Sequence, residues 1–276
     1  KHPYTRWNTL PDGRKGEYLT DRLTDEAEAY IERNKDRPFF LYLSYYSVHT
    51  PLQAPKKRVA KYEKKPAGKR HSNAIYAAMV ESVDQSVGRV MQRLEKLGLT
   101  EKTVVIFTSD NGGHGKITSH LPLRGNKGNF YEGGIRVPLI IRGPNIKPNT
   151  FCHSRVVGYD FFPTFCQWAG VKRPLPKGVE GGSIVPLLAK GQGVVKRPRE
   201  ELVFHFPHYQ SKDGPHTAIL SGDLKLIRFY ETGQLNLFNL RQDISESHDL
   251  AAKMPDKTRE LSAKLNVYLK QVSARL

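Results

Sequence analysis

The feature that most constrains the fold is an alternation of short apolar runs with one long amphipathic segment. Residues 39–46 and 103–108 have the length and composition of buried strands. Between them, apolar residues recur at steps of three and four, the spacing of a helix with one buried face. These residues are Tyr76, Val80, Val83, Val87, Val90, Leu94 and Leu97. With a further strand expected over 137–141, the alternation predicts an α/β fold in which helices flank a largely parallel sheet.

The pattern changes after about residue 190. Four short apolar runs follow with turn residues between them, at 202–206, 217–220, 224–230 and 235–239. Short strands joined by glycine-containing turns pair antiparallel. A last amphipathic helix is predicted over about 255–272. We therefore predict two domains: residues 1–200 as part of an α/β domain, and residues 201–276 as a small α+β module with an antiparallel sheet.

Composition excludes several classes of protein. With 38% hydrophobic residues, the chain is not disordered, and no run approaches the ~18 apolar residues of a membrane-spanning helix. Cys152 and Cys166 are too few for a disulfide scaffold or a four-cysteine zinc site. The net charge of +17 favours anionic partners: nucleic acid, anionic lipid, or sulfated and phosphorylated substrates. The densest basic run, 56–70, lacks the signatures of nucleic-acid-binding folds, so we predict no nucleic-acid partner. It is either a solvated loop or a groove for an acidic substrate.

Polar residues that can do chemistry follow the predicted strands. Asp110 and Asn111 come directly after the run 103–108 and offer hard oxygen ligands, which suit Ca²⁺ or Mg²⁺ rather than zinc. His49 follows the run 39–46 in the same way. In open α/β sheets, ligands bind at the carboxyl ends of strands. Taken alone, Asp-Asn-Gly-Gly after a strand is more often an ordinary turn, and a lone histidine is more often a surface or satisfied residue.

A third segment, 123–138, is rich in glycine and delivers Lys127 close to the next predicted strand. A lysine is a compact point charge that can bind a tetrahedral oxyanion. The alternative is a surface lysine in a flexible loop.

Together these motifs resemble those of the type I sulfatase family. The motifs are Ser-Val-His49-Thr-Pro, Ser-Asp110-Asn111-Gly-Gly and Gly-Asn-Lys127-Gly-x-x-Tyr-Glu-Gly-Gly-Ile-Arg-Val-Pro, in the family's order and spacing. Tyr76-x-Ala-x-Val-x-x-Val-Asp84 and Tyr159-Asp-Phe-Phe-Pro-Thr164 are similar too. The segments 222–227 and 237–243 resemble the small C-terminal module of those enzymes. The resemblance extends over nearly the whole chain.

The resemblance implies an alkaline-phosphatase-like α/β sheet and a sulfuric ester hydrolase. Carried over motif by motif, Asp110 and Asn111 would bind one divalent cation, Ca²⁺ more than Mg²⁺, while His49 and Lys127 would contact the sulfate. A cation, a lysine and a histidine placed there would stabilise the charge that develops on the sulfate oxygens.

One part of the family pattern is missing. The family's nucleophile is a formylglycine made from a Cys-x-Pro/Ala-Ser-Arg motif, and this chain has no such motif: Cys152-His-Ser-Arg155 departs from it in two places. The early Asp-Asp metal pair and the Gly-Lys-x-His motif are missing as well. We therefore expect the chain to be the C-terminal portion of a sulfatase, with formylglycine in the other half, and expect this portion alone to be inactive. A natural truncation or a degenerate relative is the alternative.

The substrate is predicted to be a sulfated carbohydrate, with an arylsulfate as the simpler possibility. His208 and His216 lie near aromatic residues in the segment 206–216, which is predicted to be a projecting loop that contacts the sugar. Packing is the other interpretation of these two histidines. The competing functions are a phosphohydrolase or phosphodiesterase of the alkaline phosphatase superfamily and a non-catalytic polyanion-binding protein. A periplasmic or secreted location is expected, and the oligomeric state stays open.

Overall fold

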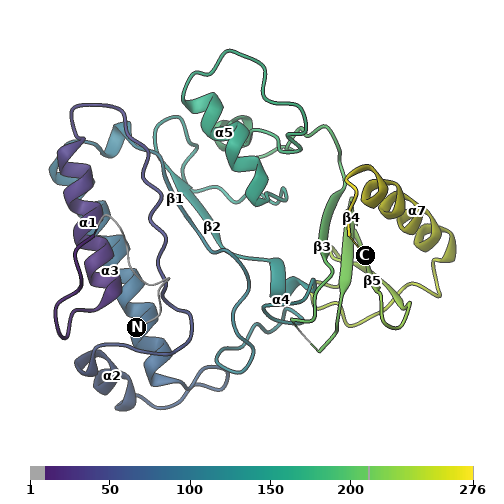
Figure 1. Ribbon diagram of the computed structural model, residues 1–276, viewed down its shortest axis with the longest axis horizontal. Helices are drawn as coiled ribbons and strands as arrows, with labels where there is room; N and C mark the ends of the chain where they lie inside the picture. Colours follow the sequence, from purple (N-terminus) through teal and green to yellow (C-terminus); the bar gives the residue numbers. More distant parts are fainter. Residues whose placement is uncertain (1–9, 211, 276) are drawn as a thin grey trace. The chain divides into compact units, whose positions relative to one another are not determined.

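The computed structural model describes residues 10–210 and 212–275 and divides into two compact units, Lys1–Thr103 and Val104–Leu276. Each unit is described by itself (Figure 1). The predicted domain boundary at residue 200 stays a prediction, and the four-stranded sheet of the second unit begins close to it, at Leu202. In the described part of the chain, no helix is long and apolar enough to cross a membrane.

Helices dominate the first unit. They are α1 (Leu19–Arg33), α2 (Lys56–Glu63) and α3 (Ala74–Lys96), and a short 3₁₀ turn, Thr100–Lys102, follows them. Helices α1 and α3 lie side by side (Figure 1). The Asn73 side chain accepts a hydrogen bond from the Tyr76 N–H at the start of α3, and Gly98 adopts a positive φ of 65° just after its end. These are standard capping arrangements, so the predicted helix between the apolar runs is confirmed.

The buried face of α3 differs from the predicted stripe of valines. The buried residues are Ala78, Met79, Ser82, Ser86 and Leu94, so Leu94 is the one member of the predicted stripe among them, whereas Val80 is 46% exposed. The buried serines make hydrogen bonds: Ser86 Oγ donates to the Tyr45 hydroxyl at 2.7 Å, and Ser82 Oγ donates to the Ala78 carbonyl oxygen at 2.8 Å. Small side chains let neighbouring elements approach closely, and their hydroxyls are satisfied there. The periodicity of large apolar residues therefore located the helix correctly but predicted its buried face only in part.

The run 39–46 is extended but forms no ladder with another strand in the residues that the structure describes. Its exposure alternates along the chain, with Phe40 64%, Tyr42 82% and Tyr46 53% exposed. A period of two is the geometry of a strand. The predicted strand is thus not part of a sheet among the residues that the structure describes.

The second unit begins with a two-stranded antiparallel ladder, β1 (Val105–Thr108) and β2 (Leu139–Arg142), in which Thr108 faces Leu139. The predicted parallel arrangement is wrong for this pair. A parallel pair needs a long crossover, usually a helix. The connection 109–138 instead folds back as a loop that contains only the four-residue helix α4 (Glu132–Ile135).

Three further elements continue this part of the chain: a 3₁₀ turn at Gly158–Asp160, α5 (Phe161–Trp168) and α6 (Val185–Lys190). Thr164 connects the two helices, because its hydroxyl donates to the Asp160 carbonyl oxygen at 2.6 Å and accepts from the Ile184 N–H at 3.1 Å. They lead to the C-terminal sheet.

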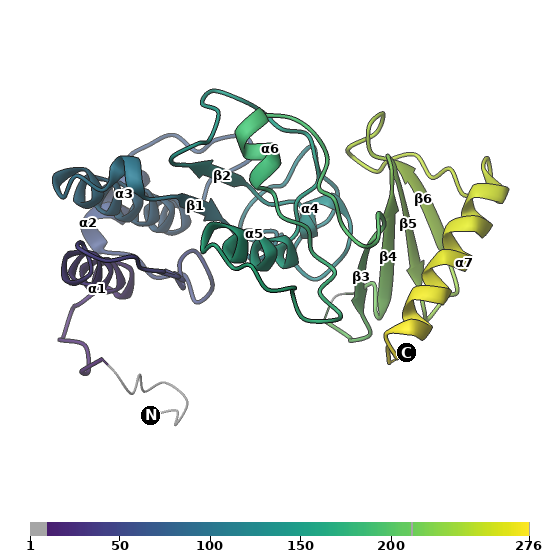
Figure 2. The same ribbon diagram turned by 90° about the horizontal axis from the view of Figure 1, so that it is seen from above.

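The C-terminal sheet matches its prediction closely. Its strands are β3 (Leu202–Phe206), β4 (His216–Ser221), β5 (Leu224–Phe229) and β6 (Leu235–Asn239), paired antiparallel in that order. Helix α7 (Pro255–Gln271) crosses one face (Figure 2). Gly222 supplies the positive φ of 55° that the tight β4–β5 turn requires. The antiparallel sheet with a terminal helix is confirmed.

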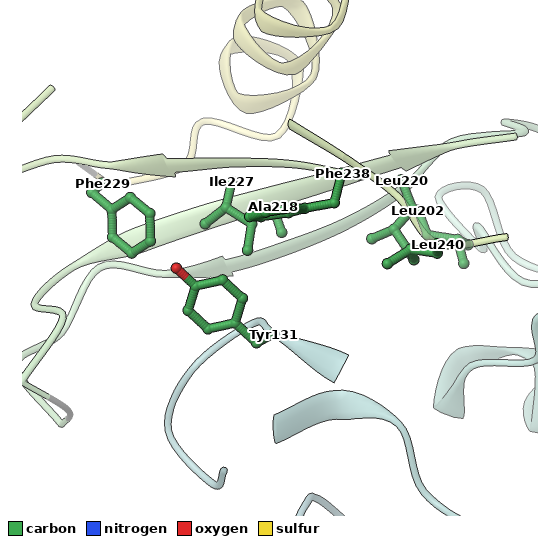
Figure 3. Packing of buried hydrophobic residues seen from close by; sticks show 8 residues of the cluster. All are labelled: Tyr131, Leu202, Ala218, Leu220, Ile227, Phe229, Phe238 and Leu240. Atoms are coloured by element: carbon green, nitrogen blue, oxygen red, sulfur yellow. The ribbon is translucent and has the colours of Figure 1, made fainter. Parts of the chain in front are cut away.

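Both faces of this sheet are buried. Leu261, Leu265 and Leu269 of α7 pack on one face. The other face carries Ile227, Phe229 and Phe238, and the Tyr131 ring packs against it from outside the sheet (Figure 3). Its centroid lies 6.4 Å from that of Phe229 and 6.1 Å from that of Phe238. The loop before α4 is therefore part of the core of the C-terminal sheet.

Candidate active site

Asp110 and Asn111 lie just beyond the end of β1, as predicted, with Ser109 between the strand and Asp110. The Asp110 side chain is exposed and that of Asn111 is half-buried. Asn111 Nδ2 donates to Asp110 Oδ2, and Ser109 Oγ donates to the Asn111 carbonyl oxygen at 3.1 Å. The two neighbouring side chains therefore present an amide and a carboxylate at the end of a strand.

The oxygen atoms of these two side chains are of the type that binds hard divalent cations. Carboxylate and amide oxygens are ligands that Ca²⁺ and Mg²⁺ prefer, and Ca²⁺ takes six to eight of them. Within residues 10–210 and 212–275, no group of three or more histidine, cysteine, aspartate or glutamate side chains is placed to hold a metal. Asp110 and Asn111 can thus supply part of a coordination shell, which other groups would have to complete.

Backbone hydrogen bonds join this strand end to the segment that carries Lys127. The Lys127 N–H donates to the Gly113 carbonyl oxygen at 3.0 Å, and the Gly112 N–H donates to the Gly134 carbonyl oxygen at 2.9 Å. Lys127 itself is half-buried. Lys127 is therefore bonded through its main chain to Gly113, which lies two positions after Asn111 in the sequence.

The close approach of these segments requires glycine. A Cβ atom at Gly112 would lie 1.9 Å from the Gly133 carbonyl oxygen, and one at Gly134 would lie 2.0 Å from the Asn129 carbonyl oxygen. Real Cβ atoms do not come so close to backbone, so any side chain here would push the two segments apart. The glycine-rich segment, predicted as a loop that delivers Lys127, makes a tight backbone-to-backbone contact, which argues against the alternative of a flexible loop. We call residues 125–134 the Lys127 loop.

His49 belongs to the first unit, at the end of the extended run. Its side chain is exposed, and its ring centroid lies 5.2 Å from that of Tyr46. Nδ1 is 2.7 Å from the Thr50 carbonyl oxygen, so this nitrogen donates its hydrogen to that oxygen. The role of His49 in sulfate binding stays a prediction.

The two histidines predicted to contact a sugar lie in different environments. His208 is exposed beyond the end of β3, 4.9 Å from the Phe206 ring. His216 begins β4 and is only 1% exposed. Its ring lies 4.6 Å from Phe130 and 5.8 Å from Phe229. The expectation that His216 projects from a loop is wrong, because aromatic packing draws it into the sheet, whereas the substrate-binding role of both residues stays a prediction.

Sequence reasoning missed a buried charged cluster behind the Lys127 loop. It consists of Lys225 on β5, Glu246 beyond β6 and Glu132 at the start of α4. Burial raises the pKa of the Glu246 carboxyl, although the nearby Lys225 ammonium opposes this. Glu132 and Lys225 lie in segments that resemble the family, but the wide spacing of the three residues gives no sequence signal that they meet.

Comparison with known proteins agrees with these motifs. A family model described as "Sulfatase" matches residues 1–171, and one described as "N-sulphoglucosamine sulphohydrolase, C-terminal" matches residues 126–275. The chain is 39% identical over 278 residues to a protein named "Sulfatase" from Formosa agariphila, covering 90% of this chain and 49% of that protein. It is 36% identical over 198 residues to the steryl-sulfatase of Mus musculus, covering 68% of this chain and 30% of that protein.

A solved structure shows the same fold. The crystal structure of Ps i-CgsB in complex with k-i-k-neocarrahexaose aligns with a TM-score of 0.80 at 29% identity, covering 94% of this chain and 56% of that chain. The alkaline-phosphatase-like α/β fold is therefore confirmed, and this chain spans about half the length of the Formosa relative and of this structure. Motifs, family models and fold agree, and the chain belongs to the sulfatase family.

Proposed function

We propose that the whole protein hydrolyses sulfate esters and that the end of β1 and the Lys127 loop form half of its active site. The observation that carries this proposal is the pair of backbone hydrogen bonds that joins the Asp110–Gly113 segment to the Lys127 loop. They join the segment that carries the side-chain oxygens of Asp110 and Asn111, which would bind the cation, to the segment that carries Lys127. Membership of the sulfatase family supports the same chemistry.

Each side chain has a defined role in this proposal. Lys127 and His49 bind the sulfate group, and their positive charge or N–H donors stabilise the negative charge that grows on its oxygens. Asp110 and Asn111 hold one divalent cation, Ca²⁺ in preference to Mg²⁺, which neutralises sulfate charge when bound. The nucleophile is a formylglycine from outside these 276 residues, so this portion alone has no turnover.

The proposal is tested by Lys127→Ala and His49→Ala in the whole protein. Each change should reduce kcat about 10²–10³-fold, the effect of losing roughly 2–4 kcal/mol of transition-state stabilisation. Neither residue is fully buried, so the melting temperature should barely move. The exposed Lys177 provides a control, because Lys177→Ala removes the same charge from the surface elsewhere. A large fall in melting temperature with near-normal sulfate release would instead assign these residues to structure.

We propose a sulfated carbohydrate as the substrate. Support comes from the net charge of +17 and from the similarity to Ps i-CgsB, which was solved with an oligosaccharide. A polymer of this kind cannot cross a membrane unaided, so a periplasmic or secreted location is part of the proposal. Phosphate ester hydrolysis is the competing activity, and the family models and relatives favour sulfate esters instead.

His208 tests the substrate class, because it is exposed beside Phe206 and can reach a ligand. If His208 contacts the sugar, His208→Ala should lower kcat/KM several-fold for a sulfated oligosaccharide and leave a small arylsulfate unaffected. His153→Ala, at another exposed histidine, is the matched control. Equal losses on both substrates, or none on either, would remove His208 from the sugar site.

A further inference from the structure

Lys225 is a fully buried lysine whose ammonium group has three oxygen partners. Its Nζ lies 2.7 Å from Glu132 Oε1, 2.8 Å from Glu246 Oε1 and 2.9 Å from the Phe130 carbonyl oxygen. A lysine ammonium has three donors, so its hydrogen-bonding capacity is filled. Two of the three acceptors, Phe130 and Glu132, belong to the Lys127 loop, and Lys225 itself comes from strand β5.

Glu246 holds the same loop from the other side. Its Oε2 accepts a hydrogen bond from the Glu132 N–H at 2.6 Å, and its carbonyl oxygen accepts from Arg124 Nη1 at 2.8 Å. Glu246 adopts a positive φ of 52°, which is uncommon for a side chain of this kind and persists only where the surroundings hold it. Arg124 precedes the Lys127 loop and Glu132 lies near its end, so both ends of the loop are tied to one residue.

The Arg124 guanidinium adds a third attachment. It lies 4.0 Å from the centre of the Tyr131 ring, and that ring packs on the C-terminal sheet. Residues on both sides of Lys127 thus rest on the sheet through charge, hydrogen bonds and an aromatic contact.

The charged character of this cluster is informative. Burying ions costs several kcal/mol each, and well-packed apolar side chains would often stabilise a protein as well or better. Ions differ from apolar groups in being directional, because each bond is lost when the partners shift by more than a fraction of an ångström. A cluster of this kind fixes where the loop sits more strictly than apolar packing would.

We propose that Lys225 and Glu246 are positioning residues that hold Lys127 in register with the sulfate. The inference rests on the proposed function, in which Lys127 contacts the sulfate, and it adds the C-terminal sheet as the support of that contact. Neither residue touches the substrate. Their effect passes through Phe130 and Glu132 to the backbone of Lys127.

The test uses Lys225→Met in the whole protein, with two readouts. Methionine keeps the length of the side chain and removes the charge. We expect kcat to fall about 10- to 100-fold, as for a catalytic group displaced by about an ångström, with a smaller change in KM. Amide hydrogen exchange in residues 125–134, which requires no activity, should become faster. Glu246→Gln keeps an oxygen for the Glu132 N–H and should give a smaller loss in both readouts, and it replaces Lys225→Met if that variant does not fold.

Arg197→Met is the matched control, because it also breaks a buried ion pair of the second unit, with Asp160. It should lower stability and leave both kcat and exchange in the loop unchanged. Folded Lys225→Met and Glu246→Gln proteins with normal kcat and normal exchange would overturn the proposal. A wild-type protein without sulfatase activity, or an unaffected Lys127→Ala, would overturn the proposed function instead, and faster loop exchange in Lys225→Met would still establish the support.

Discussion

The second unit contains two buried ion clusters with the same chemistry, the Asp160 cluster and the Lys225 cluster, but they hold different kinds of segment. Asp160 receives a two-pronged contact from Arg197, at 2.8 Å from Nε and 2.7 Å from Nη2, and also accepts the N–H groups of Val157 and Gly182. Lys225 instead divides its bonds between a glutamate beyond β6 and the Lys127 loop. The first cluster holds together segments of scaffold, and the second holds a candidate catalytic segment on the scaffold. Burial and charge alone do not separate a structural cluster from a functional one, but the partner segments do.

The two clusters can be compared by substituting a glycine beside each of them. We expect the largest change in stability and activity from the glycine beside the Lys225 cluster. At Gly134, within the Lys127 loop, a new Cβ would lie 2.0 Å from the Asn129 carbonyl oxygen and 2.7 Å from that of Asn126. Gly134→Ala should therefore cost about 3 kcal/mol or more in unfolding free energy and remove most of the sulfate release.

Gly158, two residues before Asp160, is the contrasting position. A Cβ there would have no heavy atom within 4 Å. Gly158→Ala should change the unfolding free energy by less than about 1 kcal/mol and leave activity intact. Urea unfolding and sulfate release measured on both variants check the pair, and equal behaviour would remove the distinction between the two surroundings.

A smaller effect is expected from pH, through Asp243 in the loop that carries Glu246 of the Lys225 cluster. Burial would raise the pKa of Asp243, but hydrogen bonds from the Ser245 and Ser247 hydroxyls and the His248 N–H outweigh it and hold the pKa below its usual value. A depressed carboxyl pKa means that the unfolded chain binds more protons in acid. The stabilisation is therefore complete above about pH 4 and declines as the pH falls below it.

The loop that Asp243 closes also contains Glu246. When acid weakens the hydrogen bonds to Asp243, the position of Glu246 beside Lys225 should therefore be held less firmly. We expect Asp243→Asn to cost about 2 kcal/mol at neutral pH and to flatten the acid limb of stability. Unfolding free energies between about pH 3 and pH 7 test this. An unchanged pH dependence in the variant would show that other carboxyls govern the acid limb.

The sequence predicted where helices and strands lie along the chain better than it predicted which residues pack against one another. Alternation and turn residues predicted the C-terminal strands almost to the residue, because each strand there has its partner next in the chain. The run 39–46 has the same local character, yet strand pairing also depends on what lies alongside, which local pattern does not report. The same holds for α3, where serines with hydrogen-bond partners are buried in place of valines.

In the candidate site, too, some residues could be identified from the sequence and others could not. Asp110, Asn111 and Lys127 were found from motifs, since their residue types carry the chemistry. Lys225 and Glu246 were not, because a buried lysine looks like any surface lysine in a basic chain, and its partners come from distant segments. His216 was misplaced for a related reason: its residue type suggests function, and its neighbours Phe130 and Phe229 make it part of the core.

The extended run 39–46 has a practical consequence for handling this chain by itself. It combines an extended backbone, which joins no ladder among the described residues, with the exposed rings of Phe40, Tyr42 and Tyr46. An open strand edge with apolar side chains is a template on which further strands add, including those of other copies. Preparations of these 276 residues alone should therefore be kept dilute and checked for self-association before any binding or activity is measured on them.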